Sequence, residues 1–313
     1  MKHHPFLFDN FPRSVLAVQG KDRVKFLHNL LTHDIKGLVP QQGRLACLLD
    51  RQGKIRFACI AHSCANELLL EIDPEHGAIA LEALHQYLIS EEVVLHDQTN
   101  EYRIIPIHGP SSDQLLKKIW PTCELPEISL SHRDGPADSG VRFIVRWDLF
   151  HLPGYHLWVE PKKKDAIQTL LMEAGKELHL ELGNQELFDS MRIQAGVPWP
   201  NAEIDESVIL NELDSEEWMS FTKGCYVGQE IVARIKYRAH PPRLLKKFIL
   251  QGTELPPQKS ALELERKPVG IITSSSFSPD RERIIALGFL NYGITASQLR
   301  VKTNSGEISA TMA

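Results

Sequence analysis

The sequence predicts an α+β fold followed by a smaller all-β domain, and three observations support this. With 313 residues, of which 42% are apolar, the chain can bury two or three separate cores. Strand-like and helix-like segments alternate up to about residue 240 without the regular period of a doubly wound sheet. After the sequence His240-Pro241-Pro242, helical periodicity disappears. We therefore expect a mixed α+β region over 1–240 and a second domain over 241–313.

The first hundred residues alternate between strand-like runs and two helical segments. Asp22 is the expected N-cap of a helix, because the apolar residues that follow it up to Leu31 have helical spacing. The composition of 50–53, Asp-Arg-Gln-Gly, predicts a hairpin turn between two strands. Pro74 suits the first turn of a helix that reaches about residue 89. The expected strands cover 15–18, 45–49, 55–60 and 68–72.

The middle of the chain continues this mixture of strands and helices. Between its elements, the segment 121–140 is rich in proline and glycine, which predicts either a boundary or a flexible loop. The expected strands cover 102–107, 141–147 and 155–160, and the expected helices cover 111–119, 164–174 and 184–195.

The last part of the chain consists of short apolar runs separated by proline, serine and asparagine clusters. Closely spaced strands with turn signals predict a small β-barrel or a sandwich. The runs cover 244–250, 269–273, 284–290 and 299–302.

The formal net charge of −5 argues against a surface that binds nucleic acid indiscriminately, so any basic site must be local. One run of basic residues has no acidic residue between positions 231 and 253, and it can attract a polyanion if its side chains converge. If the residues lie on a strand, alternate side chains point to opposite faces and the patch divides into ordinary solvated surface. The run comprises Arg234, Lys236, Arg238, Arg243, Lys246 and Lys247.

Targeting and redox signals are both missing from the sequence. No apolar run approaches the roughly 18 residues of a membrane span, and the start of the chain lacks the core of a signal peptide. We therefore expect a cytoplasmic protein without membrane contact. The five cysteines are an odd number without a CxxC pair, which argues against a disulfide framework.

The densest candidate for chemistry is the segment 223–230, Lys-Gly-Cys-Tyr-Val-Gly-Gln-Glu. Gly224 and Gly228 allow tight turns and the close approach of a ligand. Cys225 lies beside Lys223 and just before a segment that can start a helix, and both features favour the thiolate form of a cysteine. A thiolate attacks electrophiles or binds metal. The alternative is a buried structural cysteine in a turn.

The expected helix over 184–195 is a second candidate. Phe188 and Arg192 lie four residues apart and therefore on one stripe of the helix. An aromatic ring beside a guanidinium can stack on and hydrogen-bond a flat heterocycle. The alternative is an amphipathic helix whose arginine extends to solvent.

The segment 59–64 contains potential metal ligands but does not predict a metal site. On a strand, Cys59 points to the face opposite His62 and Cys64, and a closed zinc site needs four ligands. The sequence contains no HExxH, GxSxG, P-loop or dinucleotide motif. Hydrolase, kinase and Rossmann functions therefore lack support, and we expect no bound metal.

The segment 223–230 resembles the signature K-G-C-Y-x-G-Q-E of the YgfZ family of folate-binding proteins, which are relatives of the glycine-cleavage T protein. Residues 18–34 resemble the family's N-terminal G-x-D-x-x-x-F-L-x-x-x-x-T-x-D segment. Residues 192–198 resemble its R-I-x-x-G-x-P helix end, and 268–274 its barrel strand. The resemblance thus spans nearly the whole chain. The signature loop comprises Lys223, Gly224, Cys225, Tyr226, Gly228, Gln229 and Glu230.

This resemblance implies two interleaved α+β lobes around a central cavity that accepts tetrahydrofolate or a derivative, followed by a C-terminal β-barrel. It implies a role in the assembly or repair of iron–sulfur proteins and, through such enzymes, in tRNA modification. Cys225 would be the functional residue, with Lys223 tuning it. Phe188 and Arg192 are the expected folate contacts. Iron–sulfur proteins or their assembly factors are the implied partners, and the basic run is a weaker candidate for direct contact with tRNA.

Two departures separate this sequence from the T protein itself. The T protein's acidic G-I-x-D-D segment corresponds here to 53–58, and its G-Y-T-G-E-D-G segment to 152–155, both without a carboxylate. Losing both acids removes groups that would orient the pterin and assist aminomethyl transfer. A folate-dependent aminomethyltransferase is therefore the alternative, and a non-enzymatic interaction module is a second one.

Overall fold

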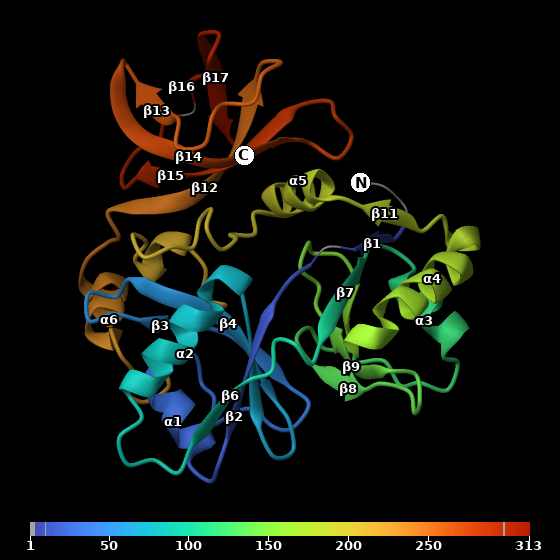
Figure 1. The fold of residues 1–313 in the computed structure, drawn as a ribbon. Coiled ribbons are helices and arrows are strands. Elements are labelled where there is room, and N and C mark those ends of the chain that lie inside the picture. The colour runs from blue at the N-terminus through green and yellow to red at the C-terminus, as the bar shows by residue number, and fades with distance from the viewer. Residues whose placement is uncertain (1–3, 10, 297) are drawn as a thin grey trace.

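The computed structural model describes residues 4–9, 11–296 and 298–313, and these form two α+β lobes and a closed six-stranded barrel (Figure 1). The α+β class and the C-terminal barrel are confirmed, and the alternative of a sandwich is wrong. Within the described residues, no helix is long and apolar enough to cross a membrane.

The first lobe contains an antiparallel sheet with the strand order β3-β4-β5-β2-β6. Its strands are β2 (Ser14–Gln19), β3 (Gly43–Leu49), β4 (Ile55–Ser63), β5 (Leu68–Ile72) and β6 (Val94–Asp97), and its helices are α1 (Arg23–Leu30), η1 (Pro74–His76) and α2 (Gly77–Gln86). On β4, Ala58 and Ile60 face the centre of the molecule, whereas Phe57 and Cys59 face a separate core under α1 and α2. Burial on both faces explains why this strand reads as a continuous apolar run.

The second lobe contains a six-stranded sheet in the order β11-β1-β7-β10-β9-β8. Its strands are β1 (Phe6–Phe8), β7 (Arg103–His108), β8 (His132–Asp134), β9 (Val141–Arg146), β10 (Gly154–Val159) and β11 (Glu181–Gly183), and its helices are α3 (Ser112–Ile119), η2 (Pro161–Lys163), α4 (Lys164–Ala174) and η3 (Lys176–Leu178). Leu115 of α3 and Leu171 of α4 are fully buried in the core on the outer face. Because β1 pairs with β7 and β11, the two lobes are interleaved in sequence.

The barrel closes in the order β12-β15-β14-β13-β16-β17 and is joined to the lobes through helix α5 (Gln185–Ala195). Its strands are β12 (Arg243–Gln251), β13 (Ala261–Leu264), β14 (Lys267–Phe277), β15 (Ile284–Asn291), β16 (Leu299–Lys302) and β17 (Glu307–Met312). Leu245, Leu287 and Phe289 of the barrel belong to the same core as the inner faces of both lobes. The expected division at residue 240 falls between α6 (Gln229–Arg238) and β12, after η4 (Leu210–Leu213).

Some local predictions are wrong. Asp22 does not cap α1 with its side chain, which instead accepts the backbone N–H of Glu92 at 2.9 Å. The helix that follows Pro74 ends at Gln86. The segment 121–140 is not a boundary, because it contains β8, which pairs with β9 of the same lobe. The strands β1, β6, β8, β11, β13 and β17, of three to six residues each, are missing from the sequence prediction.

Candidate functional site

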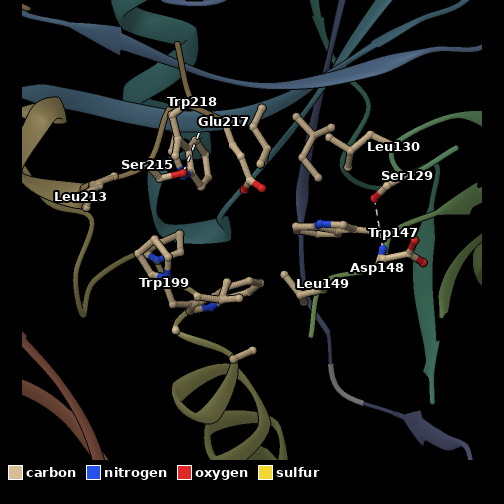
Figure 2. A pocket seen from close by; sticks show the side chains of 18 of the residues that line it. Ser129, Leu130, Trp147, Asp148, Leu149, Trp199, Leu213, Ser215, Glu217 and Trp218 are labelled. Carbon is tan, nitrogen blue, oxygen red and sulfur yellow. Dashed lines mark hydrogen bonds between the residues drawn. The ribbon is translucent and has the colours of Figure 1, made fainter. Parts of the chain in front are cut away.

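A cavity of about 790 Å³ lies where the two lobes and the barrel meet. Trp147 follows β9, Trp199 follows α5, and Trp218 precedes the signature loop, and Figure 2 shows all three side chains around one space. The indoles of Trp147 and Trp199 are stacked, with centroids 6.4 Å apart. This volume and the aromatic lining are typical of sites for small organic ligands. Leu45, Ile60, Leu149, Leu213, Leu245 and Leu287 complete the apolar wall.

Charged groups also line the cavity, and most of them are neutralised by a partner. The ion pairs are Arg13 with Glu71 (3.0 Å), Asp148 with Arg146 (3.1 Å) and Asp214 with Lys246 (2.7 Å). Among the described residues, Arg44, Lys247 and Glu217 of the lining form no ion pair. The cavity therefore offers two cations and one carboxylate to a ligand.

Arg44 supplies positive charge beside a neutral imidazole. Its Nη1 lies 3.3 Å from Nδ1 of His33, which also accepts the backbone N–H of Asp34 at 2.8 Å. Burial, together with the charge of Arg44, lowers the pKa of His33 to about 4. His33 is therefore uncharged at neutral pH. This end of the cavity suits an anionic group such as a carboxylate.

Buried imidazoles lie behind the cavity wall, between the two sheets. His62 Nε2 is 3.3 Å from Glu71 Oε2, and the Nε2 atoms of His108 and His156 are 3.1 Å apart. Burial lowers the pKa of His132 to about 3, that of His156 to about 4, and that of His108 well below its ordinary value. Burial opposes ionisation of Glu71, but the hydrogen bond with His62 and nearby positive charge outweigh it and lower its pKa to about 2. At neutral pH the Glu71 carboxylate thus lies in a cluster with the uncharged imidazoles of His108, His132 and His156.

Within the signature loop, the ammonium of Lys223 is bound to the end of a helix. It donates to the carbonyl oxygens of His28 and Leu31, where α1 ends. A helix end leaves such carbonyls without partners, so a buried cation there is stabilising. Burial lowers the pKa of Lys223 to about 8, and the charge of Asp34 is the main effect that opposes this shift. The hydrogen bonds of Lys223 go to α1 and not to the thiol.

The other residues of the loop form the turn into α6. Tyr226 is buried, with the Lys223 ammonium 4.8 Å from the centre of its ring. Gly228 has a φ of +81°, and a Cβ there would lie 2.6 Å from the carbonyl oxygen of Asp50, so only glycine fits. A Cβ at Gly224 would lie 4.0 Å from His28 Nε2, which is an ordinary contact distance. Gln229 and Glu230 begin α6. The negative charge of Glu230 is favourable there, because the N-terminus of a helix carries a partial positive charge.

Cys225 is exposed, so the alternative of a buried structural cysteine is wrong. The segment that carries it also forms part of the cavity wall. Its backbone is fastened to Thr32, whose Oγ1 donates to the carbonyl of Trp218 at 2.5 Å and whose carbonyl accepts the N–H of Ser220 at 3.0 Å. One continuous segment, 217–225, therefore lines the cavity at one end and presents the thiol at the other.

Phe188 and Arg192 lie behind the cavity, and neither is part of its lining. Phe188 is buried against Phe8, Phe11, Phe150 and Trp199, with its ring centre 4.9 Å from that of Trp199. Arg192 is buried, so the alternative of an arginine extended to solvent is wrong. Phe188 thus supports a lining tryptophan. Direct contact of either residue with folate stays a prediction.

The basic run does not form one continuous patch. Arg243 pairs with Glu212 at 2.9 Å and Lys246 with Asp214 at 2.7 Å, so two of its charges are neutralised. On α6, Lys236 pairs with Glu216. Only Arg234 and Arg238, one turn apart on α6, are exposed without an ion pair among the described residues of this helix.

The potential metal ligands of 59–64 are dispersed. Cys59 faces the core under α1 and α2, whereas His62 binds Glu71 between the sheets. Cys64 Sγ lies 3.9 Å from His132 Nε2. The described residues contain no group of three or more His, Cys, Asp or Glu side chains arranged to hold a metal ion.

Most residues that line the cavity, among them the three tryptophans, are absent from the sequence prediction, whereas Lys246 and Lys247 of the basic run are part of the lining. Trp199 lies between two prolines directly after the helix-end motif, and Trp218 shortly precedes the signature loop, so their position was an available signal. Trp147, Arg44 and Glu217 carry no such signal. They reach the cavity through the tertiary fold.

The fold and the site together define a protein with an aromatic ligand cavity beside an exposed cysteine. Residues 1–223 match the family described as the GCVT N-terminal domain. Since this match covers more than half of the chain, the protein belongs to that family.

Known relatives are similar to this chain over nearly its full length. The aminomethyltransferase of Caldanaerobacter subterraneus subsp. tengcongensis is 22% identical over 303 residues, which cover 94% of this chain and 80% of that protein. The aminomethyltransferase of Chloroherpeton thalassium is 24% identical over 301 residues, covering 95% and 82%. The crystal structure of glycine cleavage system aminomethyltransferase T from Bartonella henselae has a TM-score of 0.85 at 16% identity, covering 99% of this chain and 85% of that one. The structural similarity establishes the fold.

Proposed function

We propose that this protein binds tetrahydrofolate, or a derivative of it, in the central cavity. Proteins of its family bind tetrahydrofolate. The observation that carries the proposal is a ligand-sized space lined by Trp147, Trp199 and Trp218, which suits planar rings. Arg44 and Lys247 are cations of the same lining that can receive the carboxylates of a folate's glutamate end.

Tetrahydrofolate should quench the tryptophan fluorescence, and Trp199→Leu should weaken its binding about 10-fold. An aromatic pair contributes on the order of 1 kcal/mol beyond the area that it buries, which supports a change of this size. Trp120→Leu is a matched control, because Trp120 packs on the outer core of the second lobe. Calorimetric titration of both variants and the wild type tests this. A wild type that binds no tetrahydrofolate at millimolar concentration would contradict the proposal and favour the interaction module.

We further propose that the folate-binding protein assists the assembly or repair of iron–sulfur clusters in the cytoplasm, and thereby tRNA modification. The complete signature segment and the exposure of Cys225 support a functional thiol there. Cys47 and Cys59 are buried, and the loop has no second cysteine. A cluster is normally held by several thiolates, so the remaining ligands would come from a partner protein, from glutathione or from a distant residue of this chain. An iron–sulfur protein or an assembly factor is the partner that we propose.

Cys225→Ala should abolish the support of iron–sulfur enzymes while leaving folate affinity and thermal stability unchanged. The side chain is exposed, so its removal creates no cavity in a core. The measurement is the activity of an iron–sulfur enzyme in cells that lack the protein and are complemented with each variant. Cys123→Ala, which changes a partly exposed cysteine on the second lobe, is the control. Enzyme activity restored to the wild-type level by Cys225→Ala would refute the role of the thiol.

Aminomethyl transfer is the second candidate, and the names of the relatives favour it. The two segments expected to carry its acids have none, but Glu217 places one carboxylate in the cavity. Release of ammonia from an aminomethyl donor in the presence of tetrahydrofolate is the decisive assay. Turnover that survives Cys225→Ala would favour the transferase over the thiol-dependent function.

A further inference from the structure

Glu217 is the carboxylate of the cavity that lacks a partner. Asp148 and Asp214 are neutralised by Arg146 and Lys246, whereas the Glu217 side chain forms no ion pair or hydrogen bond among the described residues. Figure 2 shows its carboxylate directed into the space enclosed by the labelled tryptophans. An unpaired charge facing aromatic walls is a strong and selective hydrogen-bond acceptor for a ligand.

The backbone that carries Glu217 is held in place. Its own N–H donates to Ser215 Oγ at 3.3 Å. The next residue, Trp218, is anchored through its carbonyl to the hydroxyl of Thr32, which is fully buried and also accepts the N–H of Cys47 at 2.8 Å. A side chain on a fixed wall is better prepared for binding than one on a mobile loop, because less conformational entropy is lost.

We propose that Glu217 recognises the N–H donors of a planar heterocycle bound between the tryptophans, and so sets the specificity of the cavity. This inference rests on the proposed folate-binding function. A pterin carries a 2-amino group next to a ring N–H, and these two parallel donors match the two oxygens of one carboxylate. A ring without them would leave a charged acceptor unpaired in the complex, which is costly.

The charge of the cavity supports this orientation. The free cations Arg44 and Lys247 repel an N–H-rich edge and attract the anionic end of a ligand. Glu217 attracts the N–H-rich edge.

Calorimetric titration of three proteins with tetrahydrofolate tests the role proposed for Glu217. The three are the wild type, Glu217→Gln and Glu216→Gln. Glu217→Gln should weaken binding by 10- to 100-fold, because the amide keeps the shape but loses the charge and one acceptor. Glu216→Gln is the matched control, because the neighbouring Glu216 pairs with Lys236 of α6 and is not part of the cavity lining. It should bind like the wild type. The exposed position of Glu217 leads us to expect equal melting temperatures for all three.

A second ligand separates recognition from a general effect of charge. A tetrahydrofolate analogue whose 2-amino group is replaced by methyl should bind the wild type at least 10-fold more weakly, and Glu217→Gln should weaken it no further. Wild-type binding of tetrahydrofolate that is unaltered in Glu217→Gln overturns this inference alone. A wild type without any affinity for tetrahydrofolate overturns both this inference and the proposed function.

Discussion

Replacing Glu203 by alanine should lower the free energy of unfolding by about 3–5 kcal/mol, because it removes a buried acceptor of four hydrogen bonds and leaves Arg192 only its ion pair with the partly exposed Asp189. Glu203 is fully buried and accepts hydrogen bonds from Arg192 (3.0 Å), the backbone of Trp199 (3.1 Å), Thr273 (2.6 Å) and Ser274 (2.6 Å). The first two partners belong to the lobes, and the hydroxyls belong to the barrel. This single carboxylate therefore joins the two parts of the molecule.

Urea unfolding followed by circular dichroism measures this loss. Glu206→Ala is the control, because Glu206 is exposed nearby, and it should change stability by less than about 0.5 kcal/mol. The double variant Arg192→Met with Glu203→Met should lose less stability than Glu203→Ala, since the only charge left without its partner in this network, that of Asp189, is partly exposed. A loss below 1 kcal/mol for Glu203→Ala would show that the network contributes little to the junction.

Lowering the pH from 7 to 5 should remove about 3–6 kcal/mol of stability. Burial holds the pKa values of His108, His132 and His156 below the ordinary value of about 6.5 in the folded protein. These imidazoles therefore take up protons from about pH 6.5 downward in the unfolded chain, whereas in the folded protein His132 and His156 do so only near pH 3–4 and the pKa of His108 is also well below its ordinary value. Stability falls with pH across this window, by about 1–2 kcal/mol for each imidazole. Glu71, with a pKa lowered to about 2, adds to the loss only below about pH 4.5.

Urea midpoints at pH 7, 6 and 5 give this slope directly. His132→Leu should reduce the dependence of stability on pH by the contribution of one imidazole, even if the substitution also changes stability at pH 7. The exposed His85 supplies the control, since His85→Gln should leave the slope unchanged. A stability that stays constant between pH 7 and 5 would contradict the account of the buried cluster.

The fold class was accessible from the sequence because the main elements carry strong local patterns. The continuous apolar run of β4 and the helical spacing after Asp22 are visible without tertiary information. The strand β1 is not, since its three residues become a strand only through pairing with β7 and β11. The same holds for β8 within the proline-rich segment 121–140. A short strand forms because another strand pairs with it, and a single sequence does not show which segments lie side by side in the fold.

The candidate site likewise has one part that the sequence shows directly and another that only the fold brings together. The loop around Cys225 is contiguous, so its residue types and spacing could be recognised directly. The cavity is assembled from Arg44, Trp147, Trp199 and Glu217, which are far apart in the chain. Arg192 shows the limit of helix periodicity. Its stripe was evident, but its burial follows from Glu203 and the barrel hydroxyls that pack against it.

The closed barrel also sets an order of events during synthesis. It cannot close until β17, at 307–312, has left the ribosome and paired with β12. Glu203 precedes its partner Thr273 by 70 residues and β17 by about 100, which at 5–20 residues per second is an interval of several seconds. During that time the hydroxyl groups of Thr273 and Ser274, which complete the hydrogen-bond network of Glu203 and Arg192, are not yet in place. The junction between lobes and barrel is therefore the last part of this core to form on a nascent chain.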